Sequence, residues 1–134
     1  MKKLYLDMDG TIADLYGIDG WLERLESSDS NLFTECKPII TQAQLFEVFP
    51  PNEYDITILS MTPPHCTDSY ALDVVRQKNE WLDEYFPNLK KRIYKEYSHN
   101  KNLKNSEDSI LVDDNAKIRE CYRGIALDPA TLWG

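Results

Sequence analysis

The chain has no long apolar segment: no run in it approaches the roughly 18 to 20 residues that a membrane-spanning helix needs. The first ten residues, MKKLYLDMDG, also lack the apolar stretch of a signal peptide. We therefore expect a cytoplasmic protein that has no membrane partner.

Cysteine is scarce as well. Cys36, Cys66 and Cys121 are the only three, and no two of them form a C-x-x-C pair. This usage is typical of reduced thiols and argues against a disulfide framework or a zinc site. The chain also has no internal repeat or low-complexity tract. Its organisation must therefore be read from the alternation of short apolar runs with amphipathic stretches.

Positive charge is in short supply, with 15 Lys and Arg against 23 Asp and Glu and a formal net charge of −8. This balance repels the phosphate backbone and disfavours a nucleic-acid polymer as partner. A small anionic substrate stays compatible, because one bound divalent cation and one lysine can reverse the local potential. The 134 residues, 42% of them hydrophobic, fit a single domain spanning 1–134. They give no signal that separates a monomer from a weak dimer.

Five short apolar runs have the length of strands that are buried on both faces. They cover residues 3–6, 56–59, 92–94, 110–112 and 124–127. Amphipathic stretches at 70–86 and 115–123 end near Pro87 and Gly124, which are residue types that stop helices. Strands that alternate with crossover helices predict an α/β, doubly wound (Rossmann-like) fold. We expect a parallel five-stranded sheet with strand order 3-2-1-4-5.

Residues 12–54 are too many for one crossover connection. They contain an apolar patch around Trp21, a Ser/Asp-rich turn at 27–31, and a stretch at 41–49 that Thr41 can cap and Pro50 can end. We predict a small helical cap insert after strand 1. Long connections in α/β proteins are commonly lids or binding loops.

The segment DMDGT at 7–11 follows the first strand directly, so Asp7 and Asp9 fall at the carboxyl end of a central strand, where open α/β sheets bind ligands. Gly10 permits a turn that lets both carboxylates flank one point. The fourth strand ends at Asp113 and Asp114, at the same edge of the sheet. Four acids gathered there would repel one another unless a hard divalent cation neutralises them, and Mg²⁺ suits oxygen ligands of this kind.

The order of the motifs is DMDGT, a strand ending in Ser60, a lysine, and a strand ending in Asp-Asp, and this order resembles the haloacid dehalogenase superfamily. The segments WLDEYFP, ILVDD and GIAL are similar to those of its compact phosphatases, which include 5'(3')-deoxyribonucleotidases and uncharacterised bacterial and phage hydrolases. The resemblance implies a magnesium-dependent phosphatase that forms an aspartyl-phosphate. It also implies a small phosphomonoester as substrate, with a nucleoside monophosphate as the leading candidate.

The resemblance assigns roles to the four acids. Asp7 would attack phosphorus, while Asp9 would protonate the leaving oxygen and then activate water. The side chains of Asp7 and Asp113 and the backbone carbonyl of Asp9 would bind Mg²⁺, with Asp114 in or beside that shell.

The resemblance gives phosphate binding to Ser60, Met61 and a lysine that neutralises the shared charge. Lys95, Lys101 and Lys104 all lie between the third and fourth strands. Lys101 is favoured because it follows a short polar loop and precedes the Asp-Asp pair at the spacing of similar phosphatases. Lys104 is the reserve candidate.

Two other functions stay open from the sequence, a phosphotransferase and a non-catalytic phosphate-binding regulatory domain with the same fold. Retention of both Asp7 and Asp9 favours hydrolysis over the second of these. A receiver domain also clusters aspartates beside a lysine, but there the acidic pair comes first and the lysine last. The order in this chain is the reverse.

Four ring side chains near these motifs invite functional readings. We expect Tyr16 and Trp21 in the core of the insert, with a platform for a nucleobase as the alternative. His65 and His99 have no visible partner, so we expect surface or loop roles for them. His65 is close enough to Ser60 in the sequence to touch substrate.

Overall fold

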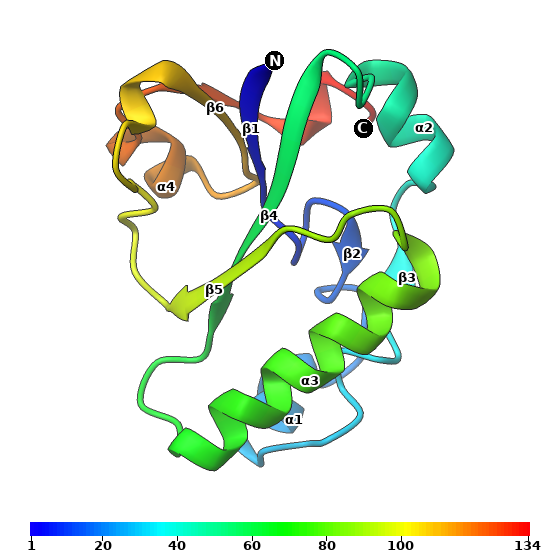
Figure 1. The fold of residues 1–134 in the computed structure, drawn as a ribbon. Coiled ribbons are helices and arrows are strands. Elements are labelled where there is room, and N and C mark those ends of the chain that lie inside the picture. The colour runs from blue at the N-terminus through cyan, green and yellow to red at the C-terminus, as the bar shows by residue number, and fades with distance from the viewer.

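Five parallel strands form the central sheet of the computed structural model, which describes residues 1–134 (Figure 1). Their spatial order is β5-β4-β1-β6-β7. The strands are β1 (Lys2–Leu6), β4 (Tyr54–Thr62), β5 (Arg92–Glu96), β6 (Ser109–Val112) and β7 (Ile125–Leu127). Counted along the chain, this is the order 3-2-1-4-5. The predicted fold class and strand order are therefore confirmed.

Two crossover helices cover the sheet. α3 (Asp68–Tyr85) joins β4 to β5 and is capped by Thr67, and α4 (Ala116–Cys121) joins β6 to β7 and is capped by Asn115. Both were predicted, although α4 stops short of residue 123 because Tyr122 is already extended (φ −77°, ψ 134°). No helix combines the length and the apolar composition that crossing a membrane requires.

The two faces of the sheet carry cores of unequal size. Leu4 and Leu6 of β1 belong to a cluster of 21 buried residues that also includes Trp81 of α3. Tyr5, which alternates with them, belongs to a cluster of five that includes Ile118 of α4. Alternate residues of a strand point to opposite faces, so the short apolar run of β1 serves both cores.

The insert between β1 and β4 contains two short helices, α1 (Trp21–Glu26) and α2 (Gln42–Val48), as predicted. Thr41 caps α2 through a capping box with Gln44, which confirms the predicted cap. The description of the insert as helical was incomplete, because β2 (Ala13–Asp14) and β3 (Lys37–Pro38) pair antiparallel within it. Strands of two residues are too short to leave a periodic pattern in the sequence.

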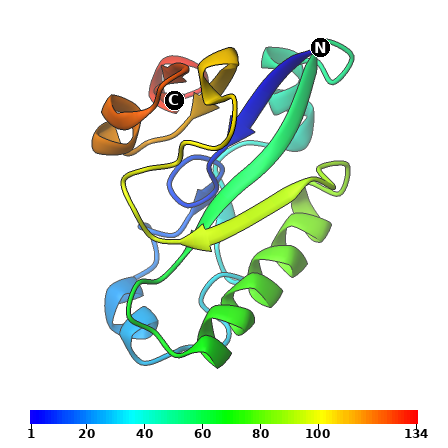
Figure 2. The ribbon, with the colours of Figure 1, turned by 60° about the vertical axis from the view of Figure 1, so that its left-hand side comes forward.

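The insert packs on the same face of the sheet as α3 (Figures 1 and 2). The backbone N–H of Phe33 donates to Gln77 Oε1 at 2.9 Å, and Trp81 Nε1 donates to the carbonyl of Cys36 at 2.7 Å. These two bonds tie the insert to α3. The segment that follows the DMDGT motif is thereby fixed beside the ends of β1 and β4.

The crossover from β5 to β6 has no α-helix and contains only the 3₁₀ turn η1 (Ser106–Asp108). Figure 2 shows it as a yellow loop that leaves β5 and returns to the sheet at β6. Lys101 lies in this loop and is almost completely buried. The loop therefore carries a lysine to the carboxyl ends of the central strands. A second 3₁₀ turn, η2 (Pro129–Thr131), follows β7 near the C-terminus.

Candidate active site

The DMDGT segment leaves β1 in a tight turn. The amides of Thr11, Ile12 and Ala13 all donate to the carbonyl of Met8. Gly10 has φ +81°, and a Cβ added to it would lie 2.3 Å from Asp114 Oδ2 and 2.7 Å from Tyr16 Cε2. Only glycine fits this place, which bears out the turn predicted for it.

Asp7 lies at the centre of a buried network of hydrogen bonds. Lys101 Nζ donates to Asp7 Oδ1 and to Asp113 Oδ2, both at 2.7 Å, and to the carbonyl of Leu59 at 3.0 Å. Thr11 Oγ1 donates to Asp7 Oδ2 at 2.8 Å. Burial alone would raise the pKa of Asp7, but the charge of Lys101 and these hydrogen bonds bring that pKa below its usual value. Asp7 is therefore ionised at neutral pH.

Asp9 is held by a different lysine, Lys78 of α3. Lys78 is fully buried, and its Nζ donates to Asp9 Oδ2 and Ser60 Oγ at 2.8 Å and to the carbonyl of Met61 at 2.7 Å. Asp9 Oδ1 is buried and has no hydrogen-bond partner. Burial raises the pKa of Asp9 in spite of the attraction of Lys78. One oxygen of this carboxyl is thus free to hold a proton.

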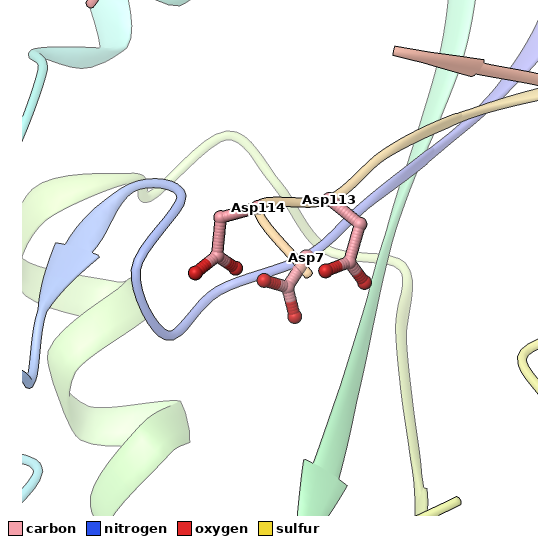
Figure 3. A group of neighbouring side chains, drawn as sticks. All are labelled: Asp7, Asp113 and Asp114. Carbon is pink, nitrogen blue, oxygen red and sulfur yellow. The ribbon is translucent and has the colours of Figure 1, made fainter. Parts of the chain in front are cut away.

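Asp113 and Asp114 extend from the end of β6 toward Asp7 (Figure 3). Asp113 Oδ1 also accepts from the amide of Asn115 at 2.9 Å. Burial and the nearby charge of Asp7 raise the pKa of Asp113 to about 6, against the attraction of Lys101. Burial, a hydrogen bond with Asp7 and the charges of Asp7 and Asp113 raise the pKa of Asp114 to about 8. Full ionisation of all four acids would therefore give the site more negative charge than its lysines balance.

The residues present fit a hard divalent cation. One oxygen from each of Asp7, Asp113 and Asp114 lies within 4.8 Å of the other two. Four carboxyl groups face two lysine ammonium groups, so two of them must be either protonated or neutralised by a cation. The donors are all oxygen atoms, as Mg²⁺ prefers. The carboxylate of Asp9 lies outside this group of three. The prediction for Asp9 concerned its backbone carbonyl.

The three candidate lysines of the β5–β6 crossover occupy different surroundings. Only Lys101 reaches Asp7. The Nζ of Lys95 donates to the carbonyl of Asn100 at 2.9 Å, and the side chain of Lys104 is exposed. Of the favoured and the reserve lysine, the structure brings the favoured one to the carboxylates.

The predicted phosphate-binding residues on β4 lie at two depths. Of the two, Met61 lines the cavity in front of the carboxylates, together with its neighbour Thr62, whereas Ser60 is buried behind the cavity, against Lys78. His65 is exposed and does not line this cavity. His99 packs its ring against Tyr97, 5.8 Å between centroids, at the surface.

Lys78 is the site residue that sequence reasoning missed. It lies on α3 four residues after Val74 and three before Trp81, both of which are buried. This spacing puts a lysine in the middle of the apolar stripe of the helix. A charged residue at such a position is rare unless it is paired, and that was the available signal.

The site opens into a cavity of about 330 Å³. Tyr16 lies at its wall with 51% of its surface exposed, and its ring meets that of Trp21 edge-on at 4.9 Å. The expectation that Tyr16 is a core residue was therefore wrong. The cavity is lined by Asp7, Asp9, Leu15, Tyr16, Trp21, Leu22, Leu25, Phe33, Met61, Thr62, Pro63, Pro64, Tyr97, Lys101, Asp113, Asp114, Asn115 and Ile118.

No family model matches the chain, and a search of curated proteins gives no match either. Function is therefore inferred from the geometry of the site and from the motifs that build it.

Proposed function

We propose that the protein is a magnesium-dependent phosphomonoester hydrolase that forms an aspartyl-phosphate on Asp7. One observation carries the proposal. Asp7 and Asp9 stand on the same turn, each held by its own buried lysine, and one oxygen of Asp9 has no partner. Two neighbouring carboxyls in such different surroundings suit the separate tasks of nucleophile and general acid.

In the first step an oxygen of Asp7 attacks phosphorus, and the bond from phosphorus to the leaving oxygen breaks. Asp9 gives that oxygen a proton from Oδ1, the atom that Lys78 leaves free. In the second step Asp9 takes a proton from a water molecule that attacks the aspartyl-phosphate. Inorganic phosphate leaves, and the carboxylate of Asp7 is restored.

The remaining residues orient these groups and balance their charge. Lys101 and Thr11 fix the carboxylate of Asp7. The hydroxyl of Ser60 accepts from Lys78 behind the cavity and so orients the lysine that holds Asp9. Mg²⁺ would be held by the side chains of Asp7, Asp113 and Asp114 and by the backbone carbonyl of Asp9. When bound, the ion supplies positive charge to the phosphoryl oxygens.

The decisive experiment measures phosphate release from an aryl phosphate and from a panel of phosphorylated metabolites that includes nucleoside monophosphates. Wild type, Asp7→Asn and the surface control Asp108→Asn are compared, each with Mg²⁺ and with a chelator. We expect turnover only in wild type and the control, and only with Mg²⁺. Activity that survives in Asp7→Asn or in the chelator contradicts the mechanism. A wild type that is inactive on every compound favours the non-catalytic domain instead.

A further inference from the structure

The wall of the cavity changes from acidic to aromatic side chains just beyond the carboxylates. The ring of Tyr16 lies against Gly10 and beside Asp114, so an aromatic surface begins where the acids end. Trp21 continues this surface from the insert, and Tyr97, which is 43% exposed, adds to it from the loop after β5. Tyr16 and Tyr97 are open to solvent, whereas Trp21 is half-buried against the main core. Large rings around a cavity are typical of surfaces that bind a ligand.

The same cavity has no positively charged side chain that is free to bind a substrate. Lys101 is the only Lys, Arg or His among its lining residues. An ammonium group has three hydrogen-bond donors, and those of Lys101 bind Asp7, Asp113 and the carbonyl of Leu59. A carboxylate or a second phosphate on the substrate would therefore enter a site that holds four acids and offers it no free positively charged side chain.

Beyond the carboxylates, hydroxyl groups would find few partners. The uncharged side chains on the wall that can form hydrogen bonds are those of Thr62, Asn115, the two tyrosines and the indole N–H of Trp21. The side-chain oxygen of Asn115 already caps α4. A leaving group with several hydroxyls would exchange water for an apolar surface and lose hydrogen bonds.

We infer that the substrate is a monoester of a single phosphate whose leaving group carries an uncharged aromatic ring. The inference rests on the proposed function and narrows it. The ring packs against Tyr16, Trp21 and Tyr97, and the acids reject a second anionic group. Two sources share this chemistry: a ring joined almost directly to the phosphate, as in an aryl or benzyl ester, and a nucleoside, whose ring follows a sugar.

The test compares primary alkyl monophosphates, whose leaving groups have similar intrinsic reactivity. They are benzyl phosphate, a nucleoside 5'-monophosphate, a hexose 6-phosphate and a phosphorylated hydroxy acid. We expect kcat/KM for at least one ring-bearing ester to exceed that for the hexose phosphate about tenfold or more, with the hydroxy acid lowest. The ratio of kcat/KM for benzyl phosphate to that for the nucleoside 5'-monophosphate shows whether the ring is joined almost directly to the phosphate or follows a sugar. Equal values for all four esters, or a preference for the hexose, overturn the inference.

Substitutions in the cavity wall test whether its aromatic side chains cause the preference for ring-bearing esters. We expect the ratio of kcat/KM for the ring-bearing ester to that for the hexose phosphate to fall about three- to tenfold in each of Trp21→Leu and Tyr97→Leu. Leu72→Ala, which changes an exposed apolar residue of α3 outside the cavity, serves as the control and should leave it unchanged. Leu22→Lys adds a cation to the rim and should improve kcat/KM for the hydroxy-acid phosphate a few-fold. A preference that persists in both ring variants contradicts the assignment.

A calorimetric titration separates failure of this inference from failure of the proposed function. Asp7→Asn protein is titrated with benzyl phosphate and with hexose 6-phosphate in the presence of Mg²⁺. If wild type hydrolyses no ester but Asp7→Asn binds the benzyl ester about tenfold more tightly than the hexose phosphate, the hydrolase is wrong and the ring site stands. Equal affinities, or no detectable binding of the benzyl ester, overturn the ring site whether or not the protein is an enzyme.

Discussion

Two lysine–aspartate pairs stand side by side at the end of β1, and they are built differently. In the first pair, Lys101 from the β5–β6 crossover holds Asp7, and both oxygens of Asp7 accept hydrogen bonds. In the second, Lys78 from α3 holds Asp9 by one oxygen, and the other has no partner. The pKa of Asp7 is lowered and that of Asp9 is raised. Two acids of one type, two residues apart, therefore differ through the number of donors that reach each of them.

A buried lysine therefore does not by itself fix the charge of its partner. The nucleophile needs enough donors to stay ionised, whereas the acid needs one donor that orients it and a free oxygen that can carry a proton. The two lysines come from separate segments of the fold. Each pair can therefore be changed without touching the other.

The largest effect should come from Lys101→Met, which breaks the first pair. It leaves Asp7 and Asp113 buried without a counter-charge, so we expect a loss of about 3 to 5 kcal/mol in the free energy of unfolding, together with loss of turnover. Denaturant unfolding and kcat/KM measure the two effects. Lys104→Ala is the matched control and should change stability by no more than about 0.5 kcal/mol. Equal effects of the two substitutions would show that Lys101 is not the lysine of the site.

Lys78→Met should break the second pair and reveal its different task. If Lys78 positions Asp9 as an acid, the variant should lose about 100-fold in kcat/KM on an alkyl phosphate. Its loss on 4-nitrophenyl phosphate should be about tenfold smaller, because that leaving group departs without a proton. Among Lys101→Met molecules that remain folded, both substrates should slow alike. The same loss on both substrates in Lys78→Met would leave Lys78 with a structural role only.

Removal of the metal should affect Asp113, which shares Lys101 with Asp7, and Asp114, which forms no ion pair with a lysine. A carboxyl whose folded pKa lies above its unfolded value of about 3.9 contributes stability that is complete below that value. This stability is lost as pH rises through the folded pKa. For Asp113 and Asp114 these values are about 6 and about 8, so in a chelator Tm should fall from pH 5 to pH 8, by an amount on the order of 5 °C. Mg²⁺ should restore Tm most at pH 8. A Tm in the chelator that is constant or rises over this window would contradict the charge imbalance.

The smallest effect should come from Asp114→Asn, which removes one unbalanced acid and leaves both lysine pairs in place. In the chelator at pH 8 we expect a gain in the free energy of unfolding on the order of 1 kcal/mol, because a half-buried charge beside two other acids is lost. The rise in Tm on adding Mg²⁺ should shrink. Differential scanning calorimetry measures both changes. Destabilisation of the metal-free protein by this substitution would show that the hydrogen bonds of Asp114 to Thr11 and Asp7 outweigh the repulsion among the acids.

The strands of the sheet were readable from the sequence because parallel strands are buried on both faces and appear as continuous apolar runs. The short strands β2 and β3 were not, since two residues carry no period. The motif order in the chain led to Asp7, Lys101 and Asp113, and the structure places them together.

Contacts made across the fold could not be read in the same way. Lys78 contacts Asp9, 69 residues away, and only its place within an apolar helical stripe pointed to it. Tyr16 faces the cavity, beside Gly10 and Asp114. Gly10 follows β1 and Asp114 follows β6, so these surroundings form only when the chain is folded. Which ring of an insert stays open to solvent depends on how the insert docks, and local pattern does not specify docking.

The most direct test of the two unequal pairs is the mass of Asp9→Asn protein after incubation with 4-nitrophenyl phosphate and Mg²⁺. This substrate needs no acid, so Asp7 should still be phosphorylated, but without Asp9 no base activates water for the second step. We expect the protein to gain the mass of one phosphoryl group, located on the peptide that contains Asp7. The gain should be absent in the double variant Asp7→Asn/Asp9→Asn. Rapid turnover by Asp9→Asn, or a phosphoryl group on another residue, would contradict the assignment of nucleophile and acid.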